Sequence, residues 1–160
     1  MSRIPYASPS EMIAWASRIM ERPRDFYIGD DPLAPYLNRW WIIPRSTGAN
    51  CYLHEILRSD DDRALHDHPW ANTSMVIDGR YIEHLPDGSS HMREAGSIVT
   101  REATAAHRLE ILPGERAVSL FITGPKVRDW GFHCPKGWVH WKDFTAGENG
   151  ESVGAGCGEP

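Results

Sequence analysis

Between residues 40 and 134 the sequence consists of short runs rich in β-branched and aromatic residues, separated by turn-forming residues. Asp78-Gly79 and Asp87-Gly88 are strong hairpin signals, and Pro113-Gly114 is a turn pair. No helical pattern alternates with the runs, so a parallel sheet with crossover helices is disfavoured. The pattern predicts an antiparallel all-β sandwich or barrel. About eight strands are expected, at Trp40–Pro44, Ala49–Arg58, Ser74–Ile77, Arg80–His84, Gly96–Thr100, Ala106–Leu112, Ala117–Thr123 and Asp129–Cys134.

The residues before these runs predict a helix. Ser8 can cap it, Pro9 suits its first turn, and Glu11 completes a capping box. Pro23 ends the helix, because proline lacks the backbone N–H that a helix interior needs. We therefore expect three parts: an N-terminal helix and connection packed on the barrel (residues 1–39), the barrel itself (residues 40–145) and a flexible glycine-rich tail (residues 146–160).

Composition excludes several classes of protein. A chain of 160 residues fits one domain, and 41% hydrophobic residues without a long uncharged apolar run indicate a soluble globular protein with no membrane partner. Its 17 basic and 22 acidic residues give a net charge of -5, which argues against nucleic acid as a partner. Three cysteines do not suggest a disulfide framework; Cys157 is expected to be an incidental thiol of the tail, and Cys134 is given no catalytic role. The N-terminus lacks the basic flank and apolar core of a signal peptide, so a reducing cytoplasm is the expected location.

His66-Asp67-His68 is the sharpest local signal for chemistry. Residues two apart on a strand project from the same face, so both imidazoles can reach one metal ion while Asp67 points away. The chain contains eight histidines, so such a pair can also arise by chance. The downstream spacing therefore decides whether the pair belongs to a metal site.

Two spacings resemble the motifs of the cupin superfamily. In the first motif a His-x-His pair is followed after three or four residues by Glu and after six more by Gly; here His68 is followed by Asn72 at the Glu position and then by Gly79. In the second motif a Gly precedes a His by eleven positions, as Gly96 precedes His107. The departures from the second motif are Glu102 and Thr104 in place of Pro and Gly, and Ile111 in place of Asn.

The resemblance implies a double-stranded β-helix, the cupin barrel or jelly roll, in which His66, His68 and His107 bind one divalent metal near the barrel mouth. Three imidazoles leave the charge of the ion uncompensated, which favours an anionic substrate or hydroxide. Such a centre is similar to the three-His centres of thiol dioxygenases and other dioxygenase cupins. Fe(II) is the first choice, with Zn, Mn or Ni as alternatives. Asn72 either contributes an amide oxygen to this pocket or is a strand residue turned elsewhere, and the three histidines could instead be ordinary sheet residues bonded to backbone carbonyls.

Other residues are candidates for the substrate pocket. Trp70 directly follows the histidine pair, and Trp130 belongs to an aromatic segment that either caps the barrel core or walls a pocket. Arginine can hold a carboxylate through two parallel hydrogen bonds, which makes Arg45 and Arg58 candidates. His54 shares a strand face with Arg58, so Arg58 and His54 are the candidate catalytic residues beyond the metal.

The expected function is therefore that of a mononuclear metal-dependent enzyme, an Fe(II) dioxygenase acting on a small carboxylate or thiol. One alternative is a non-catalytic barrel that binds a metal or a small ligand. Another is a metal-independent isomerase or epimerase, which would need a base such as His66 or His107 and a tyrosine across the pocket. A small-molecule substrate is the expected partner, and a homodimer is compatible with this class of barrel.

Overall fold

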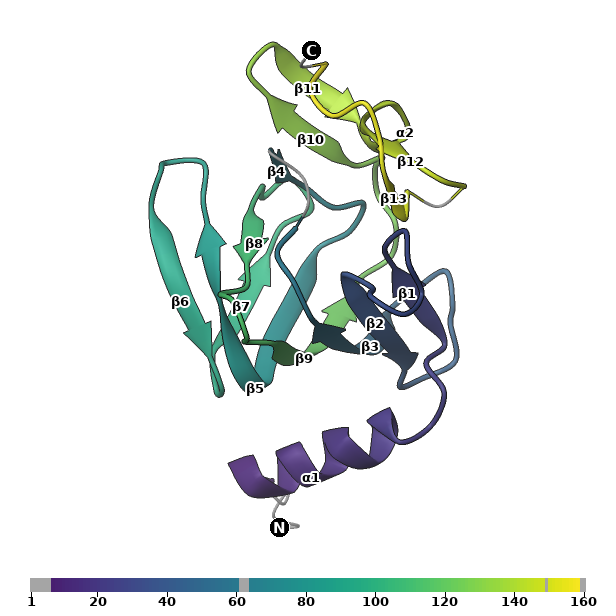
Figure 1. Ribbon diagram of the computed structural model, residues 1–160, viewed down its shortest axis with the longest axis vertical. Coiled ribbons are helices and arrows are strands. Elements are labelled where there is room, and N and C mark those ends of the chain that lie inside the picture. Colours follow the sequence, from purple (N-terminus) through teal and green to yellow (C-terminus); the bar gives the residue numbers. More distant parts are fainter. Residues whose placement is uncertain (1–6, 61–63, 149, 159–160) are drawn as a thin grey trace.

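A curled antiparallel sheet of eight strands forms the body of the part of the chain that the structure describes (Figure 1). This computed structural model describes residues 7–60, 64–148 and 150–158. Its elements are α1 (Pro9–Met20), β1 (Phe26–Ile28), β2 (Leu37–Trp41), β3 (Asn50–Ile56), β4 (Leu65–His66), β5 (Asn72–His84), β6 (Ser90–Glu94), β7 (Ile98–Arg101), β8 (Arg108–Glu110), β9 (Ala117–Thr123), β10 (Gly131–Cys134), β11 (Gly137–His140), α2 (Trp141–Phe144), β12 (Thr145–Ala146) and β13 (Ser152–Val153). The predicted all-β fold with an N-terminal helix is confirmed.

The main sheet has the strand order β1-β2-β3-β9-β5-β6, and β7 and β8 also pair with β5. A smaller sheet contains β11, β10 and β4, and β12 pairs with β13. Figure 1 shows this smaller sheet and the C-terminal hairpin at the end of the molecule opposite α1. The sheet also begins earlier than predicted, because β1 lies in the expected connection and β2 starts at Leu37.

The longest strand, β5, bends in its middle. The register against β9 shifts just before Asp78, which marks a β-bulge. Gly79 has a φ of +70°, and an added Cβ would lie 1.9 Å from the carbonyl oxygen of Arg116. The predicted hairpin at Asp78-Gly79 is therefore wrong: the pair bends one continuous strand, and the two strands expected on either side of it are both parts of β5. The hairpin at Asp87-Gly88 is confirmed, since it joins β5 to β6.

Helix α1 begins as predicted and covers one face of the sheet. The Ser8 side chain accepts a hydrogen bond from the backbone of Glu11, and the Glu11 side chain accepts one from Ser8. Ala16 of the helix packs in a buried cluster with Ile77 and Val118. Among the described helices, none is long and apolar enough to cross a membrane.

The other face of the sheet lines the interior of the barrel. Val76 and Ala117, which directly precede Ile77 and Val118 in sequence, belong to a second buried cluster. This alternation is the two-residue period of a strand, and it separates the helix-covered face from the cavity-lining face. Tyr81, also in this second cluster, lines the cavity described below.

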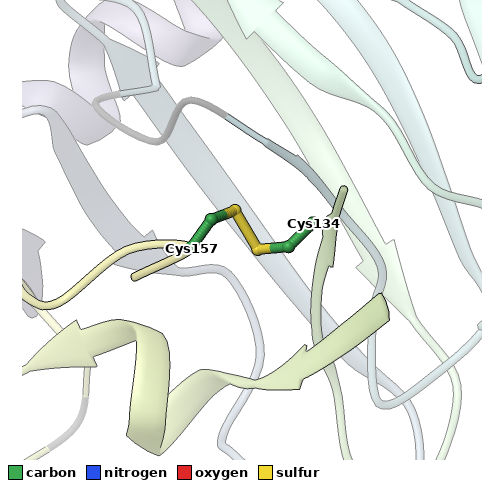
Figure 2. Close-up of a disulfide and its surroundings, with 2 residues drawn as sticks. All are labelled: Cys134 and Cys157. Atoms are coloured by element: carbon green, nitrogen blue, oxygen red, sulfur yellow. A yellow bond between two sulfur atoms is a disulfide. The ribbon is translucent and has the colours of Figure 1, made fainter. Parts of the chain in front are cut away.

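The C-terminal residues are joined to the barrel by a disulfide. Cys157 is bonded to Cys134 of β10, as Figure 2 shows. The expectations of an incidental thiol at Cys157 and of no disulfide are therefore wrong. The β12–β13 hairpin and a hydrogen bond from Gly156 N to Phe144 O bring the end of the chain back to β10, a tertiary approach that sequence spacing does not reveal.

Candidate metal centre

The three predicted ligands converge at one end of the barrel interior. One nitrogen from each of His66, His68 and His107 lies within 4.8 Å of those of the other two. His66 and His107 form an isolated β-bridge with reciprocal backbone hydrogen bonds of 2.9 Å. The backbone of His68 is fixed by a 3.0 Å hydrogen bond from its amide N–H to the carbonyl oxygen of Ala103. Residues from β4, its following loop and the segment before β8 therefore present three imidazoles to one point.

A buried carboxylate fixes the His107 ring. The Nδ1 atom of His107 lies 2.7 Å from Oε1 of Glu83, whose side chain is completely buried. Arg93 Nε donates to the same carboxylate at 2.8 Å, and Arg101 donates to it through Nε and Nη2. Burial acts to raise the pKa of Glu83, but these partners lower it to about 2. The hydrogen bond from His107 is the largest of the lowering causes. Because Nδ1 is engaged, Nε2 of His107 is the nitrogen left for a metal.

A second carboxylate lies beside His66. Oδ2 of Asp60 is 3.6 Å from Nδ1 of His66 and accepts a 2.7 Å hydrogen bond from the backbone of Leu109. The hydroxyl of Tyr36 donates to the other oxygen of Asp60. A carboxylate behind an imidazole is the usual second-layer arrangement around a metal-binding histidine.

Burial keeps the rings of His68 and His107 neutral. Removal from water, together with the positive charge of neighbouring groups, lowers the pKa of His68 well below 6.5. Burial also lowers the pKa of His107 to about 4, although the bond to Glu83 acts in the opposite direction. Nδ1 of His68 is buried without a hydrogen-bond partner among the described residues. Neutral imidazole is the form that binds a divalent metal, so the rings of His68 and His107 suit such an ion, and His66 completes a set of three nitrogen donors.

A largely apolar cavity of about 440 Å³ opens from the three histidines into the barrel. Trp70 stacks on His68 with ring centroids 5.2 Å apart, and the centroid of Trp130 lies 6.3 Å from that of His66. Both tryptophans line the cavity, as do Arg45 and His54. These predicted residues are therefore brought together with the candidate ligands.

Arg58 and Asn72 are placed elsewhere. Neither is among the described residues that line the cavity. Arg58 lies beside Gly29, where an added Cβ would meet its Nη2 atom at 3.4 Å. Asn72 faces Thr123 and Arg101 across neighbouring strands, and its buried amide has no hydrogen-bond partner among the described residues.

Sequence reasoning missed an arginine on the cavity wall. Arg39 of β2 lies opposite His54 of β3, and its Nε donates to Nε2 of His54 at 2.9 Å. Burial, reinforced by the charge of Arg39, lowers the pKa of His54 well below 6.5, so this histidine is a neutral acceptor. Burial also lowers the pKa of Arg39 to about 10, which still leaves it charged at neutral pH. The alternation of Leu37, Arg39 and Trp41 in β2 is the signal that could have placed Arg39 on the inner face.

Comparisons with known proteins identify the fold. No protein-family model matches the sequence, and no curated protein matches it. Among solved structures, the polyketide cyclase RemF from Streptomyces resistomycificus is 19% identical with a TM-score of 0.50, over 59% of this chain and 69% of that chain. The structure of FeII HppE is 13% identical with a TM-score of 0.50, over 66% of this chain and 57% of that chain. Together with the curled antiparallel sheet, these likenesses show the double-stranded β-helix fold that the sequence predicts.

Proposed function

The chain has the cupin fold with three histidines converging on its cavity, and from this premise we propose that it is a mononuclear metal-dependent enzyme, an Fe(II) dioxygenase of a small anionic molecule. The observation that carries the proposal is the three-histidine set of His66, His68 and His107 at the end of a cavity lined mainly by apolar side chains. Three protein ligands leave coordination positions open, as in catalytic metal sites. The Fe(II) named for the neighbouring structure of HppE supports iron as the ion.

The residues of the site would have two roles: to hold the metal ion and to exclude water from the substrate. His66, His68 and His107 would hold the ion, and Glu83 would keep the His107 ring turned toward it. A bound ferrous ion supplies redox chemistry toward O₂. Trp70 and Trp130 would exclude water from the reacting molecule, which limits the escape of reactive species.

The substrate is expected to be anionic because the charge of the bound metal ion would not be compensated by its ligands. Three neutral ligands compensate none of the charge of a divalent ion. Of the two carboxylates beside the ligands, Glu83 is already matched by Arg93 and Arg101, and Asp60 accepts hydrogen bonds from a hydroxyl and a backbone N–H. A carboxylate or thiolate would therefore find a favourable potential at the open positions.

The test combines metal analysis with O₂ uptake. Protein purified without an affinity tag should carry about one Fe per chain, or take it up anaerobically, and a folded His66→Ala, His68→Ala double variant should not. Fe-loaded protein should then consume O₂ with one member of a panel of small carboxylates and thiols, and Zn-loaded protein should not. Replacement of the exposed His91 by Ala is the matched control and should leave both results unchanged. Tight iron binding without O₂ uptake for any member would favour the non-catalytic barrel.

A metal-independent isomerase or epimerase has one supporting observation. The Tyr36 hydroxyl, Asp60 and His66 form a row of proton-carrying groups, and all three residues line the cavity. Such a row could supply a base and an acid to one substrate. Turnover that survives removal of metal by a chelator, and that is lost in Tyr36→Phe, would favour this alternative over the dioxygenase.

A further inference from the structure

We propose that Arg39, held by His54 and assisted by Arg45, binds the carboxylate of the substrate, and that the substrate is a small aromatic acid whose ring lies between Arg39 and the histidine triad. This inference rests on the proposed function for the reacting end of the molecule. It adds the residue that selects the substrate and the chemical class that is selected.

Arg39 is a cation of the cavity without an acidic partner. Other arginines of the barrel pair with carboxylates: Arg101 and Arg93 with Glu83, and Arg80 with Glu115. Among the described residues, no carboxylate forms an ion pair with Arg39, whose side-chain hydrogen bond goes to the neutral His54. That bond uses only Nε, so both terminal nitrogens remain for a ligand.

The carboxylates of the cavity wall are engaged away from Arg39. Asp60 accepts from Tyr36 and from the backbone of Leu109. The carboxylate of Glu151 lies against Gly147, where an added Cβ would meet it at 2.5 Å. The wall therefore offers Arg39 no internal counter-ion among its described residues.

A second cation strengthens the demand for an anion. Arg45 lines the same cavity, and its guanidinium lies 5.7 Å from the ring centroid of Trp41. It is close enough to Arg39 to disfavour the charged form of that guanidinium. Arg45 is exposed at the rim of the cavity, and two neighbouring cations that repel each other are stabilised together by one carboxylate.

Aromatic rings connect Arg39 with the candidate metal centre. The ring centroid of Phe121 lies 5.0 Å from that of His54, the partner of Arg39, and 6.3 Å from that of His68. Trp70 contacts both Phe121 and His68, with centroid distances of 5.5 and 5.2 Å. A flat apolar body can lie along these rings with its charged group at Arg39 and its other end at the histidines. An aliphatic acid would leave this aromatic wall less well covered.

Folding stability does not explain the position of Arg39. A guanidinium that is partly withdrawn from water and has no counter-ion destabilises the empty protein. Its stacking on Tyr52, with a distance of 4.8 Å to the ring centroid, offsets only part of this penalty. A cation kept at such a position is best explained by a ligand that pairs with it.

The test measures the binding of benzoate and phenylacetate, with benzamide and phenylacetamide as neutral probes of the same shape. Dissociation constants from NMR titration are compared for metal-free and Zn-loaded protein. The carboxylates should bind more tightly than the amides in both forms. Arg39→Gln should weaken carboxylate binding roughly ten- to hundred-fold and leave the amides unchanged. Arg39→Lys should retain part of the difference, because it keeps the charge and loses the fork. Arg18→Gln, on the exposed surface of α1, is the matched control and should change nothing.

The outcomes separate this inference from the proposed function. Equal binding of benzoate and benzamide, or benzoate binding that folded Arg39→Gln and Arg39→Lys leave unchanged, would overturn the carboxylate site. Benzoate binding that requires Zn and ignores Arg39 would place the carboxylate at the metal; it would overturn the inference and support a metal site. Arg39-dependent binding in a protein that takes up no metal would support the inference while the proposed dioxygenase fails.

Discussion

The Nδ1 atom of His107 lies 2.7 Å from Oε1 of Glu83, and this single contact links the candidate metal centre to the ion-pair network of the barrel wall. Arg93 and Arg101 reach the same carboxylate from β6 and β7. Glu83 thus orients a ligand while its charge is matched by two arginines. Removing the charge of Glu83 should therefore weaken both metal binding by His107 and the stability of the barrel wall.

Glu83→Gln is expected to weaken Zn²⁺ binding by roughly ten- to hundred-fold, because the His107 ring loses a charged partner that fixes it and raises its basicity. The variant should also unfold more easily, since two arginines lose their buried counter-ion. Competition with a chromogenic chelator measures the affinity, and urea unfolding measures the stability. Glu94→Gln on the exposed edge strand β6 serves as the control and should leave both quantities unchanged. Unaltered Zn²⁺ affinity in a folded Glu83→Gln protein would show that the contact does not orient the ligand.

The stability of the metal-free protein should fall as the pH drops below 6.5. The folded-state pKa of His107 is about 4, and those of His54 and His68 also lie well below 6.5. Below pH 6.5 the unfolded chain therefore binds protons that the folded chain does not bind. For His107 alone, this lowers the free energy of unfolding by roughly 3 kcal/mol at pH 4. The pKa of Glu83 is about 2, so its contribution is complete above pH 4.5 and is lost as the pH falls toward 2.

Urea unfolding of the metal-free protein at pH 7.5, 6.0 and 5.0 tests this expectation. The free energy of unfolding should be highest at pH 7.5 and clearly lower at pH 5.0. His91→Gln changes an exposed histidine and should keep the same pH dependence. A free energy that does not change from pH 7.5 to 5.0 would contradict burial of the neutral rings.

Reduction of the Cys134–Cys157 disulfide should destabilise the protein by about 2–4 kcal/mol, because the bond closes a loop between residues separated by 23 positions. It should also increase proteolysis near residues 150–156, part of which lines the cavity. Thermal unfolding with and without a phosphine reductant, compared with Cys157→Ser, measures the first effect. Cys51 is the free cysteine of the described chain, so Cys51→Ser should respond to the reductant as the parent protein does. Three reactive thiols in the denatured, unreduced protein would refute the disulfide.

The sequence predicts the parts of the site that depend on spacing along the chain. The His66-x-His68 pair lies beside the bridge to His107, so a strand period and the distance from Gly96 sufficed to bring three ligands together. The Asp78-Gly79 pair shows the limit of this reasoning. Its local chemistry suits both a hairpin and a bulge, and only the pairing of β5 with β9 decides between them.

Charges inside the barrel were beyond prediction from one sequence. Glu83 and Arg39 lie in strands where polar residues ordinarily face water. Their burial depends on partners distant in sequence, such as Arg101 for Glu83 and His54 for Arg39. The disulfide of Cys157 is missed for the same reason, because the return of the chain to β10 is a tertiary event. Alternation within one strand makes Arg58 a candidate and leaves Arg39 out, because the sequence alone does not show which strand faces the cavity.

Metal binding should raise the melting temperature through the three histidines together. At a free Zn²⁺ concentration of about 100 times the dissociation constant, binding stabilises the folded state by about 2.7 kcal/mol. For a domain of this size that corresponds to a rise of roughly 5–10 °C. His107→Ala should lose most of this rise, since two imidazoles remain, whereas His91→Ala should keep it. Differential scanning fluorimetry with and without Zn²⁺ measures both. An equal rise in a folded variant that lacks all three histidines would place the metal elsewhere on the protein.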